Sequence, residues 1–438
     1  MDQPELQYSL PHELEEQILQ YLSHDIPSLK ATSLACHRFA YTSRKYLFNT
    51  VVLTFSSHGV IQTSPRRFME ILISSPYIGD FVQNLSIVDD RYKIGGYTHL
   101  RFDTILPTCL PLLKGLRAIA VQSNSLTSLG WDAMSTDVQN ALEDAFQAPT
   151  LVSLSFYRIL DVPLRLLSMP PSLKNLSLRL VTFKKATGLN GSRDVGKLPR
   201  LTSLLLMLSD STFNLFSQWI ASQESSLDIS DVRKLSVTMT MEYYDHGNVR
   251  MLLDATASSL EIFCFSPVFG GFYLLGLLPL LLLTSHRLGP SNIVDINPIQ
   301  VDNLRNLRVL RLRLGMMQVL LNRHPPNFSS WVLRIISQLN SENLYEISLK
   351  LDFARQLQEG RLVFDTSGWS TLDSEITKSC PYLRKFRVYV LDEDGSGDEV
   401  RSSLQSQLVS LVARGILSIE RGWDSSYRNH PSYLLQVI

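Results

Sequence analysis

The stretch Leu173-Lys-Asn-Leu-Ser-Leu-Arg179 decides the fold, because its spacing of apolar residues recurs along most of the chain. An apolar residue is followed by two variable residues, a second apolar residue, one variable residue and a third apolar residue. The last two apolar positions alternate with polar ones, which is the period of a strand with one buried face. Copies of this spacing begin at Phe48, Val82, Leu116, Leu151, Leu173, Leu201, Val232, Leu260, Leu307, Leu344 and Leu383.

The segments between these copies have the pattern of helices, and successive copies from Val82 onward start 22 to 47 residues apart. A strand followed by a helix cannot bury its own apolar side, so neighbouring units must stack on one another. We therefore expect an α/β fold over residues 48–438, with about eleven irregular repeats, parallel strands on a concave face and helices outside. The expected helices cover 65–73, 136–146, 213–221, 331–339 and 400–413.

This arrangement resembles a leucine-rich-repeat solenoid, and the resemblance is carried by the strand half of the motif. The alternative is a doubly wound α/β domain, in which helices cover both faces of the sheet and strands are almost continuously apolar. In Leu307-Arg-Val-Leu-Arg-Leu-Arg313, as in the stretch quoted first, polar residues alternate with the apolar ones. One face of the sheet should then remain in contact with water, which favours the solenoid.

The N-terminal residues 1–47 follow a different pattern, that of three short amphipathic helices. Leu10-Pro11 opens the first, since proline suits the first turn of a helix. Pro27 can start the second helix, and the third begins near His37. Three such helices bury too little surface to be stable alone, so their apolar side chains need a partner. We expect Leu14, Ile18, Leu19 and Leu22 to share one apolar stripe of the first helix. The second helix carries Leu29 and Leu34, and the third carries Phe39.

This spacing resembles an F-box, although Phe39 stands where tryptophan is usual and His12 where a small residue or proline is common. The resemblance implies a non-catalytic substrate receptor of an SCF-type (Skp–cullin–F-box) ubiquitin ligase, which binds a Skp adaptor and, through it, a cullin scaffold. The alternative is a cap that only covers the first edge of the repeat array, which would make the protein a scaffold. The residues that the resemblance assigns to adaptor binding are Leu10, Pro11, Leu14, Ile18, Leu19, Leu22, Leu29, Leu34 and Phe39.

The charge of the chain argues against nucleic-acid binding. Its 438 residues include 41 basic and 41 acidic residues, whereas nucleic-acid binding usually needs a strongly basic domain. A helix-turn-helix-like alternative would use His37, Arg38, Arg44 and Lys45 on the third helix. The neutral total charge makes this alternative the weaker one.

Two further features point to a reducing compartment, the cytoplasm or the nucleus. The residues Met1–Glu5 have neither the basic nor the apolar region of a secretory signal. The four cysteines (Cys36, Cys109, Cys264 and Cys380) are far apart, which is typical of buried thiols rather than of a disulfide framework or zinc site.

The face that the strands should turn to water changes in character along the chain. In the early copies it carries small neutral residues such as Ser86, Ala120 and Ser155, and in the middle it becomes apolar. In the last three copies it becomes basic, with only Glu346 interrupting, which suits an acidic or phosphorylated target protein. The alternative is a solvated face without a ligand. The residues of this basic patch are Arg311, Arg313, Lys350, Lys385 and Arg387, with Tyr389 beside them.

Other motifs carry no chemistry. Residues 191–197 have the Gly-x4-Gly-Lys spacing of a phosphate-binding loop but lack the following Ser or Thr and the helix. The acidic run 392–399 lacks the glutamate that closes a calcium loop. The sequence contains no constellation for nucleophilic, metal or acid–base catalysis, so we expect neither an enzyme nor a cofactor.

One apolar segment, residues 262–285, has no charged side chain. Its glycines and a proline favour a buried part of the array, and a membrane span is the minor alternative.

Overall fold

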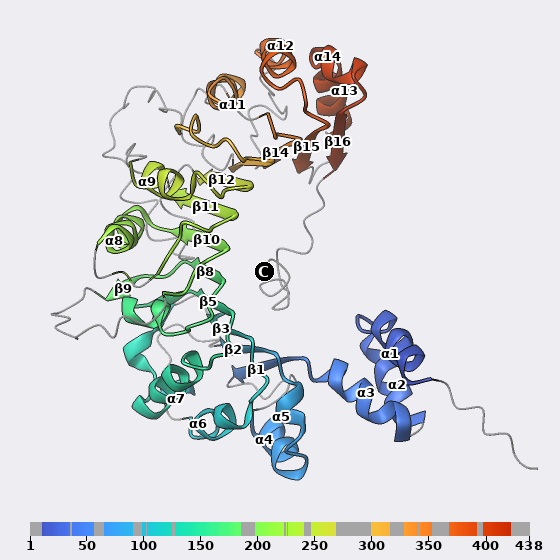
Figure 1. The fold of residues 1–438 in the computed structure, drawn as a ribbon, viewed down its shortest axis with the longest axis vertical. Coiled ribbons are helices and arrows are strands. Elements are labelled where there is room, and N and C mark those ends of the chain that lie inside the picture. Colours follow the sequence, from blue (N-terminus) through green and yellow to red (C-terminus); the bar gives the residue numbers. More distant parts are fainter. Residues whose placement is uncertain are drawn as a thin grey trace, which may run out of the picture.

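The computed structural model shows a mixed α/β protein with three N-terminal helices, followed in the chain by one large parallel sheet (Figure 1). We call the three helices the N-terminal module and the remainder the sheet body. The structure describes residues 11–35, 37–56, 65–90, 99–101, 103–124, 128–184, 198–222, 225, 227–240, 247–268, 299–315, 328–339, 342–352, 368–391 and 397–421.

The N-terminal module consists of α1 (His12–Tyr21), α2 (Ile26–Ala35) and α3 (His37–Leu47), as the sequence predicts. Pro11 is the residue that precedes α1, and its missing N–H costs nothing there. The Asp25 carboxylate begins α2 by accepting hydrogen bonds from the Ser28 backbone N–H at 3.2 Å and the Ser28 hydroxyl at 2.6 Å. These hydrogen bonds lower the pKa of Asp25, because they stabilise its ionised form.

Within the described residues, one sheet holds twelve strands, all of them parallel and in chain order. Each copy of the sequence motif coincides with one of its strands, so the predicted parallel sheet is confirmed. The strands are β1 (Thr50–Ser56), β2 (Asn84–Asp90), β3 (Ala118–Ser123), β5 (Ser153–Tyr157), β8 (Asn175–Arg179), β10 (Ser203–Leu208), β11 (Lys234–Thr240), β12 (Ile262–Val268), β13 (Val309–Gly315), β14 (Glu346–Asp352), β15 (Lys385–Leu391) and β16 (Leu417–Arg421).

Helices connect the strands and lie along the outer, convex side of the curved sheet (Figure 1). Two very short pairs lie apart from the main sheet: β4 (Leu129–Gly130) with β6 (Ile159–Leu160), and β7 (Val162–Pro163) with β9 (Phe183–Lys184). The helices are α4 (Pro65–Ser74), α5 (Ile78–Phe81), α6 (Ile105–Cys109), α7 (Thr136–Phe146), α8 (Asp210–Ala221), α9 (Gly247–Thr256), α11 (Phe328–Ile336), α12 (Trp369–Ser379), α13 (Gly397–Gln407) and α14 (Val409–Ala413).

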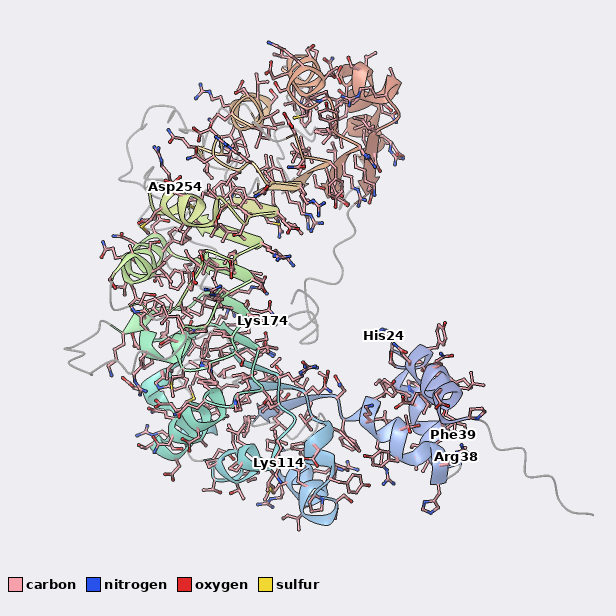
Figure 2. All side chains as sticks on the ribbon, in the orientation of Figure 1. His24, Arg38, Phe39, Lys114, Lys174 and Asp254 are labelled. Atoms are coloured by element: carbon pink, nitrogen blue, oxygen red, sulfur yellow. The ribbon has the colours of Figure 1, made fainter. Side chains whose placement is uncertain are left out.

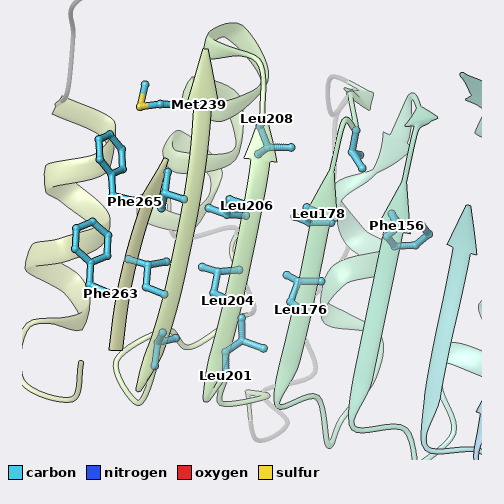
Figure 3. Close-up of a cluster of buried hydrophobic side chains, with 14 of the residues drawn as sticks. Phe156, Leu176, Leu178, Leu201, Leu204, Leu206, Leu208, Met239, Phe263 and Phe265 are labelled. Carbon is cyan, nitrogen blue, oxygen red and sulfur yellow. The ribbon is translucent and has the colours of Figure 1, made fainter. Parts of the chain in front are cut away.

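The core lies between the sheet and these helices. The repeated apolar residues of each motif point to this side, as Figure 3 shows for Leu176 and Leu178 on β8 and for Leu204 and Leu206 on β10. Leu204 lies beside Leu176, and Leu206 beside Leu178, in the parallel register, and all four are buried. Each such side chain contributes roughly 1.5–3 kcal/mol through its burial.

The C-terminal end of the sheet differs from the prediction in two ways. The helix expected over 400–413 is divided into α13 and α14, with Leu408 between them. A twelfth strand, β16, follows, although its motif lacks the first apolar residue. Arg414 stands at that position instead, and its guanidinium donates to the backbone oxygens of Pro381 at 3.0 Å and Leu383 at 3.2 Å.

The concave face is less exposed at its N-terminal end than the sequence predicts. Ser86, Ala120 and Ser155 are buried, so the expectation of a solvated face is wrong for these strands. Their side chains are short, and strands about 4.8 Å apart let longer neighbours cover them. Gln122 illustrates this, because its amide donates a hydrogen bond to the Ser86 hydroxyl at 2.9 Å.

The apolar segment 262–285 begins with β12, which pairs with β11 and β13 as the repeat predicts. The rest of the segment lies outside the described residues, as do residues 191–197 and 392–396 of the two rejected motifs. In the described parts of the chain, no helix has the length and apolar character to cross a membrane.

Candidate functional site

The outward face of α1 carries large apolar side chains. Successive residues of a helix are about 100° apart around its axis, so Leu14, Ile18 and Tyr21 share one stripe. Leu14 is 46% exposed and Ile18 is 45% exposed, and Tyr21 also lies open to solvent. Glu15 and Leu19 lie on a second stripe, about 100° away, and both are buried. The expectation that Leu14, Ile18 and Leu19 share one stripe is therefore wrong, because the helix has an outward and an inward apolar side.

The residues assigned to adaptor binding separate into two groups. Leu19 and Leu29 are fully buried, so they hold the module together. Leu34 on α2 is 87% exposed, and Leu22 and Phe39 are half-buried. Leu10 lies outside the described residues. The members that remain available to a partner are Pro11, Leu14, Ile18 and Leu34, and Tyr21 is an addition that the sequence analysis missed.

An ion pair joins α1 to α3 inside the module. The Nε of Arg38 lies 2.7 Å from the Oε1 of Glu15, whose side chain is almost completely buried. A second pair, Lys45 with Glu16 at 3.6 Å, is exposed at both ends. Because a buried carboxylate needs a partner and an exposed one does not, the Arg38–Glu15 pair is the one that fixes the two helices together.

Replacing Arg38 with alanine should destabilise the module by about 1–3 kcal/mol, since the buried Glu15 carboxylate loses a charged hydrogen bond. Hydrogen exchange of the α1 amides should accelerate accordingly. Lys45→Ala is the matched control, and it should change the exchange little. Equal effects of the two variants would contradict this account.

The module contacts the sheet body through aromatic side chains of α3 and α5. The ring of Tyr41 lies 5.1 Å from that of Phe81 and 6.3 Å from that of Tyr77, and Arg44 donates to the Tyr77 hydroxyl at 2.5 Å. Figure 2 shows Arg38 and Phe39 on the module, well apart from Lys174 and Asp254 of the sheet body. The outward stripe of α1 therefore belongs to a small module beside the sheet body.

The basic patch is a continuous surface, because the parallel register aligns its residues in rows across the sheet. Arg311, Ser348 and Arg387 form one row. Arg313, Lys350 and Tyr389 form the next, and β16 extends it with Glu420. The register thus places Arg311, Arg313, Lys350 and Arg387 on one face of the sheet, and Lys385 lies beside Glu346 in the preceding row.

Glu346 lies within the patch and offsets part of its charge. Its carboxylate is 3.9 Å from the guanidinium nitrogens of both Arg311 and Arg387, and it accepts a hydrogen bond from Ser348 at 3.0 Å. Arg387 also donates to the Tyr389 hydroxyl at 3.2 Å. This hydrogen bond, with the charge of Glu346, raises the pKa of Arg387 and keeps its guanidinium ionised. The patch is therefore a positive surface with one carboxylate at its centre.

A polar cavity of about 550 Å³ lies at the N-terminal edge of strands β10 to β14. Arg233 and Arg308 each lie 3.7 Å from the carboxylate of Glu261. The sequence analysis missed this group, although all three residues directly follow the first apolar residue of successive motif copies. Asp231 also lines the cavity, so two arginines and two carboxylates offset one another there and the cavity has no strong preference for either sign.

The described cysteines give no sign of a reactive thiol. Burial raises the pKa of Cys109 and that of Cys380 to about 11. Burial also raises the pKa of Cys264, although the nearby Arg311 and Lys234 lower it. Among the residues that the structure describes, no group of three or more His, Cys, Asp or Glu side chains is placed to hold a metal ion.

Cys109 and Cys380 should therefore resist alkylation in the folded protein. At about pH 8 a thiol of pKa 11 is ionised to roughly one part in a thousand, against about a quarter for an ordinary cysteine. Reactivity should rise as the pH approaches 11, because only the thiolate attacks. Iodoacetamide labelling followed by peptide mass spectrometry measures this, with urea-unfolded protein as the control. Equal labelling rates in both states would contradict the pKa shifts.

No protein-family model matches this chain, and no curated protein matches its sequence.

Proposed function

We propose that this protein is the substrate-recognition subunit of an SCF-type ubiquitin ligase. Its N-terminal module is an F-box that binds a Skp adaptor, and through the adaptor a cullin scaffold. The observation that carries this proposal is the exposure of Leu14, Ile18 and Leu34 on a small helical module that lies beside the sheet body. Leu14 and Ile18 share one stripe of α1 with Tyr21, and grouped exposed apolar side chains are typical of protein interaction sites.

In this proposal the sheet body is a leucine-rich-repeat-like solenoid that captures a target protein. The basic patch provides the target contacts, because guanidinium groups form paired charged hydrogen bonds with acidic or phosphorylated groups. The chain itself performs no chemistry. It holds a target lysine near a ubiquitin-charged enzyme that other subunits recruit, which raises the effective concentration of the reacting groups.

The alternative is a non-catalytic scaffold whose N-terminal helices only cap the array. The contact of Tyr41 with Tyr77 and Phe81 favours this alternative, because it attaches the module to the sheet body. A cap that served only the sheet body would not place large apolar residues on its outer side.

The test is complex formation between the purified full chain and a recombinant Skp adaptor. Size-exclusion chromatography should show co-elution, and titration calorimetry should show saturable binding with a negative heat-capacity change, the mark of apolar burial. Separate elution with no heat of binding would leave only the scaffold.

A further inference from the structure

A second cationic cluster lies on the concave face, nearer to the N-terminal end of the sheet. Tyr157 ends β5 and pairs with Arg179 at the end of β8. The guanidinium of Arg179 lies 5.3 Å from the centre of the Tyr157 ring, and that of Arg158 lies 5.4 Å from it. Two guanidinium groups thus lie against one aromatic ring. We call Tyr157, Arg158 and Arg179 the Tyr157 cluster.

The backbone fixes the direction of Arg158. This residue has a left-handed conformation, with a φ of 56°, which is uncommon for a residue other than glycine. Its N–H donates to the backbone oxygen of Arg179 at 2.9 Å, and its own oxygen accepts from the N–H of Leu129 at 2.9 Å. A side chain held in place before binding loses less entropy when it binds a ligand.

The Tyr157 cluster and the basic patch face the same concave surface at a defined separation. Strands β10, β11 and β12 lie between β8 and β13, so four strand spacings separate them, or about 19 Å. Between them the half-buried positions Leu205, Met207, Ser236 and Cys264 are uncharged, and one cation, Lys234, lies at the start of β11. The surface therefore concentrates positive charge at its two ends and is mostly neutral or apolar in between.

We propose that these two clusters are the two anchors of a single binding site for an extended acidic peptide that crosses the strands. Carboxylates at one end of the peptide bind Arg158 and Arg179, and carboxylates at the other end bind Arg311, Arg313 and Lys350. An extended chain advances about 3.3 Å per residue, so about six uncharged residues separate the two acidic ends. This binding site rests on the proposed function, because the peptide is taken to be part of the target protein.

Two carboxylates lie among the cations of the patch. Glu346 lies between Arg311 and Arg387, and Glu420 lies beside Tyr389 in the next row. They offset part of the positive charge, so the attraction of the patch for an anion is weaker than its cations alone would give. We assign the acidic ends of the ligand to glutamate or aspartate side chains, each with a single charge.

The experiment uses the purified full chain without any adaptor and a fluorescein-labelled peptide with Glu-Glu at each end of a six-residue Ser/Ala/Leu spacer. Fluorescence anisotropy should show binding that weakens as salt is added, because the contacts are ionic. A peptide whose spacer has two residues cannot reach both anchors, and it should bind roughly tenfold more weakly.

Variants of the protein locate the two anchors. Arg179→Gln and Arg311→Gln should each reduce the affinity for the long peptide roughly tenfold, because each removes a central cation from one of the two anchors. Arg233→Gln, at the N-terminal edge cavity, is the matched control and should leave the affinity unchanged. Thermal melting checks that each variant folds.

Binding that does not depend on spacer length, or that Arg179→Gln leaves unchanged, would overturn the two-anchor site. A phosphoserine version that binds more than tenfold better would overturn the assignment to carboxylates. Because no adaptor is present, these outcomes are independent of the adaptor test. The peptide can fail to bind although the adaptor binds, and the peptide can bind although the adaptor does not.

Discussion

The double variant Ile18→Asp, Leu34→Asp should lose adaptor binding by a factor of at least about 100. Both side chains are exposed in the free protein, so their replacement costs little folding stability. In a complex with the adaptor each would be buried, where an apolar side chain contributes roughly 1.5–3 kcal/mol. An aspartate there loses that contribution and also has to give up its hydration. Since 1.4 kcal/mol corresponds to a factor of ten, two such sites account for the expected loss.

Titration calorimetry with the adaptor measures the effect, and Ile73→Asp is the matched control. Ile73 is 67% exposed on α4 of the sheet body, so the same change is made at an equally open apolar residue away from the module. The control should bind as the unaltered protein does. If the double variant also binds unchanged while its helical circular dichroism is retained, Ile18 and Leu34 are not part of the adaptor surface.

The second large effect should follow from Asp373→Ala at the C-terminal end of the sheet. Asp373 is buried on α12, and its two carboxylate oxygens accept hydrogen bonds from the backbone N–H groups of Ser410 at 2.8 Å and Leu411 at 2.9 Å. These N–H groups belong to the first turn of α14, where no intrahelical partner exists. Alanine would leave one buried and one half-buried donor without an acceptor, at a cost of about 2–4 kcal/mol.

Because α14 leads directly into β16, the damage should be concentrated in these two elements. Hydrogen exchange should accelerate in residues 409–421 far more than in β5 or β8. Asp373→Asn keeps one acceptor oxygen and should lose roughly half as much stability. If Asp373→Ala leaves exchange in α14 unchanged, the carboxylate is not what attaches this helix.

The strands could be predicted from the sequence because each apolar residue of the motif has the same local surroundings in every repeat. The positions of Arg311, Lys350 and Arg387 in the rows could be predicted from the motif spacing, since parallel strands in chain order align equal motif positions. Strand β16 was not predicted, because Arg414 replaces the first apolar residue of its motif. The Arg414 guanidinium donates hydrogen bonds to backbone oxygens of the preceding repeat. That compensation comes from the turn before β15 and cannot be recognised in the local sequence pattern.

For the candidate site, the sequence by itself determined which residues are apolar and at what helical spacing, and so predicted three N-terminal helices. Only the tertiary structure decided that Leu19 faces inward while Leu14 and Ile18 face outward, because that choice depends on where α3 packs. It also decided that Glu346 lies between two arginines and that two guanidinium groups lie against the Tyr157 ring. Spacing along one chain segment sets the periodicity of a helix or strand, whereas burial and charge pairing are set by whatever the fold places against it.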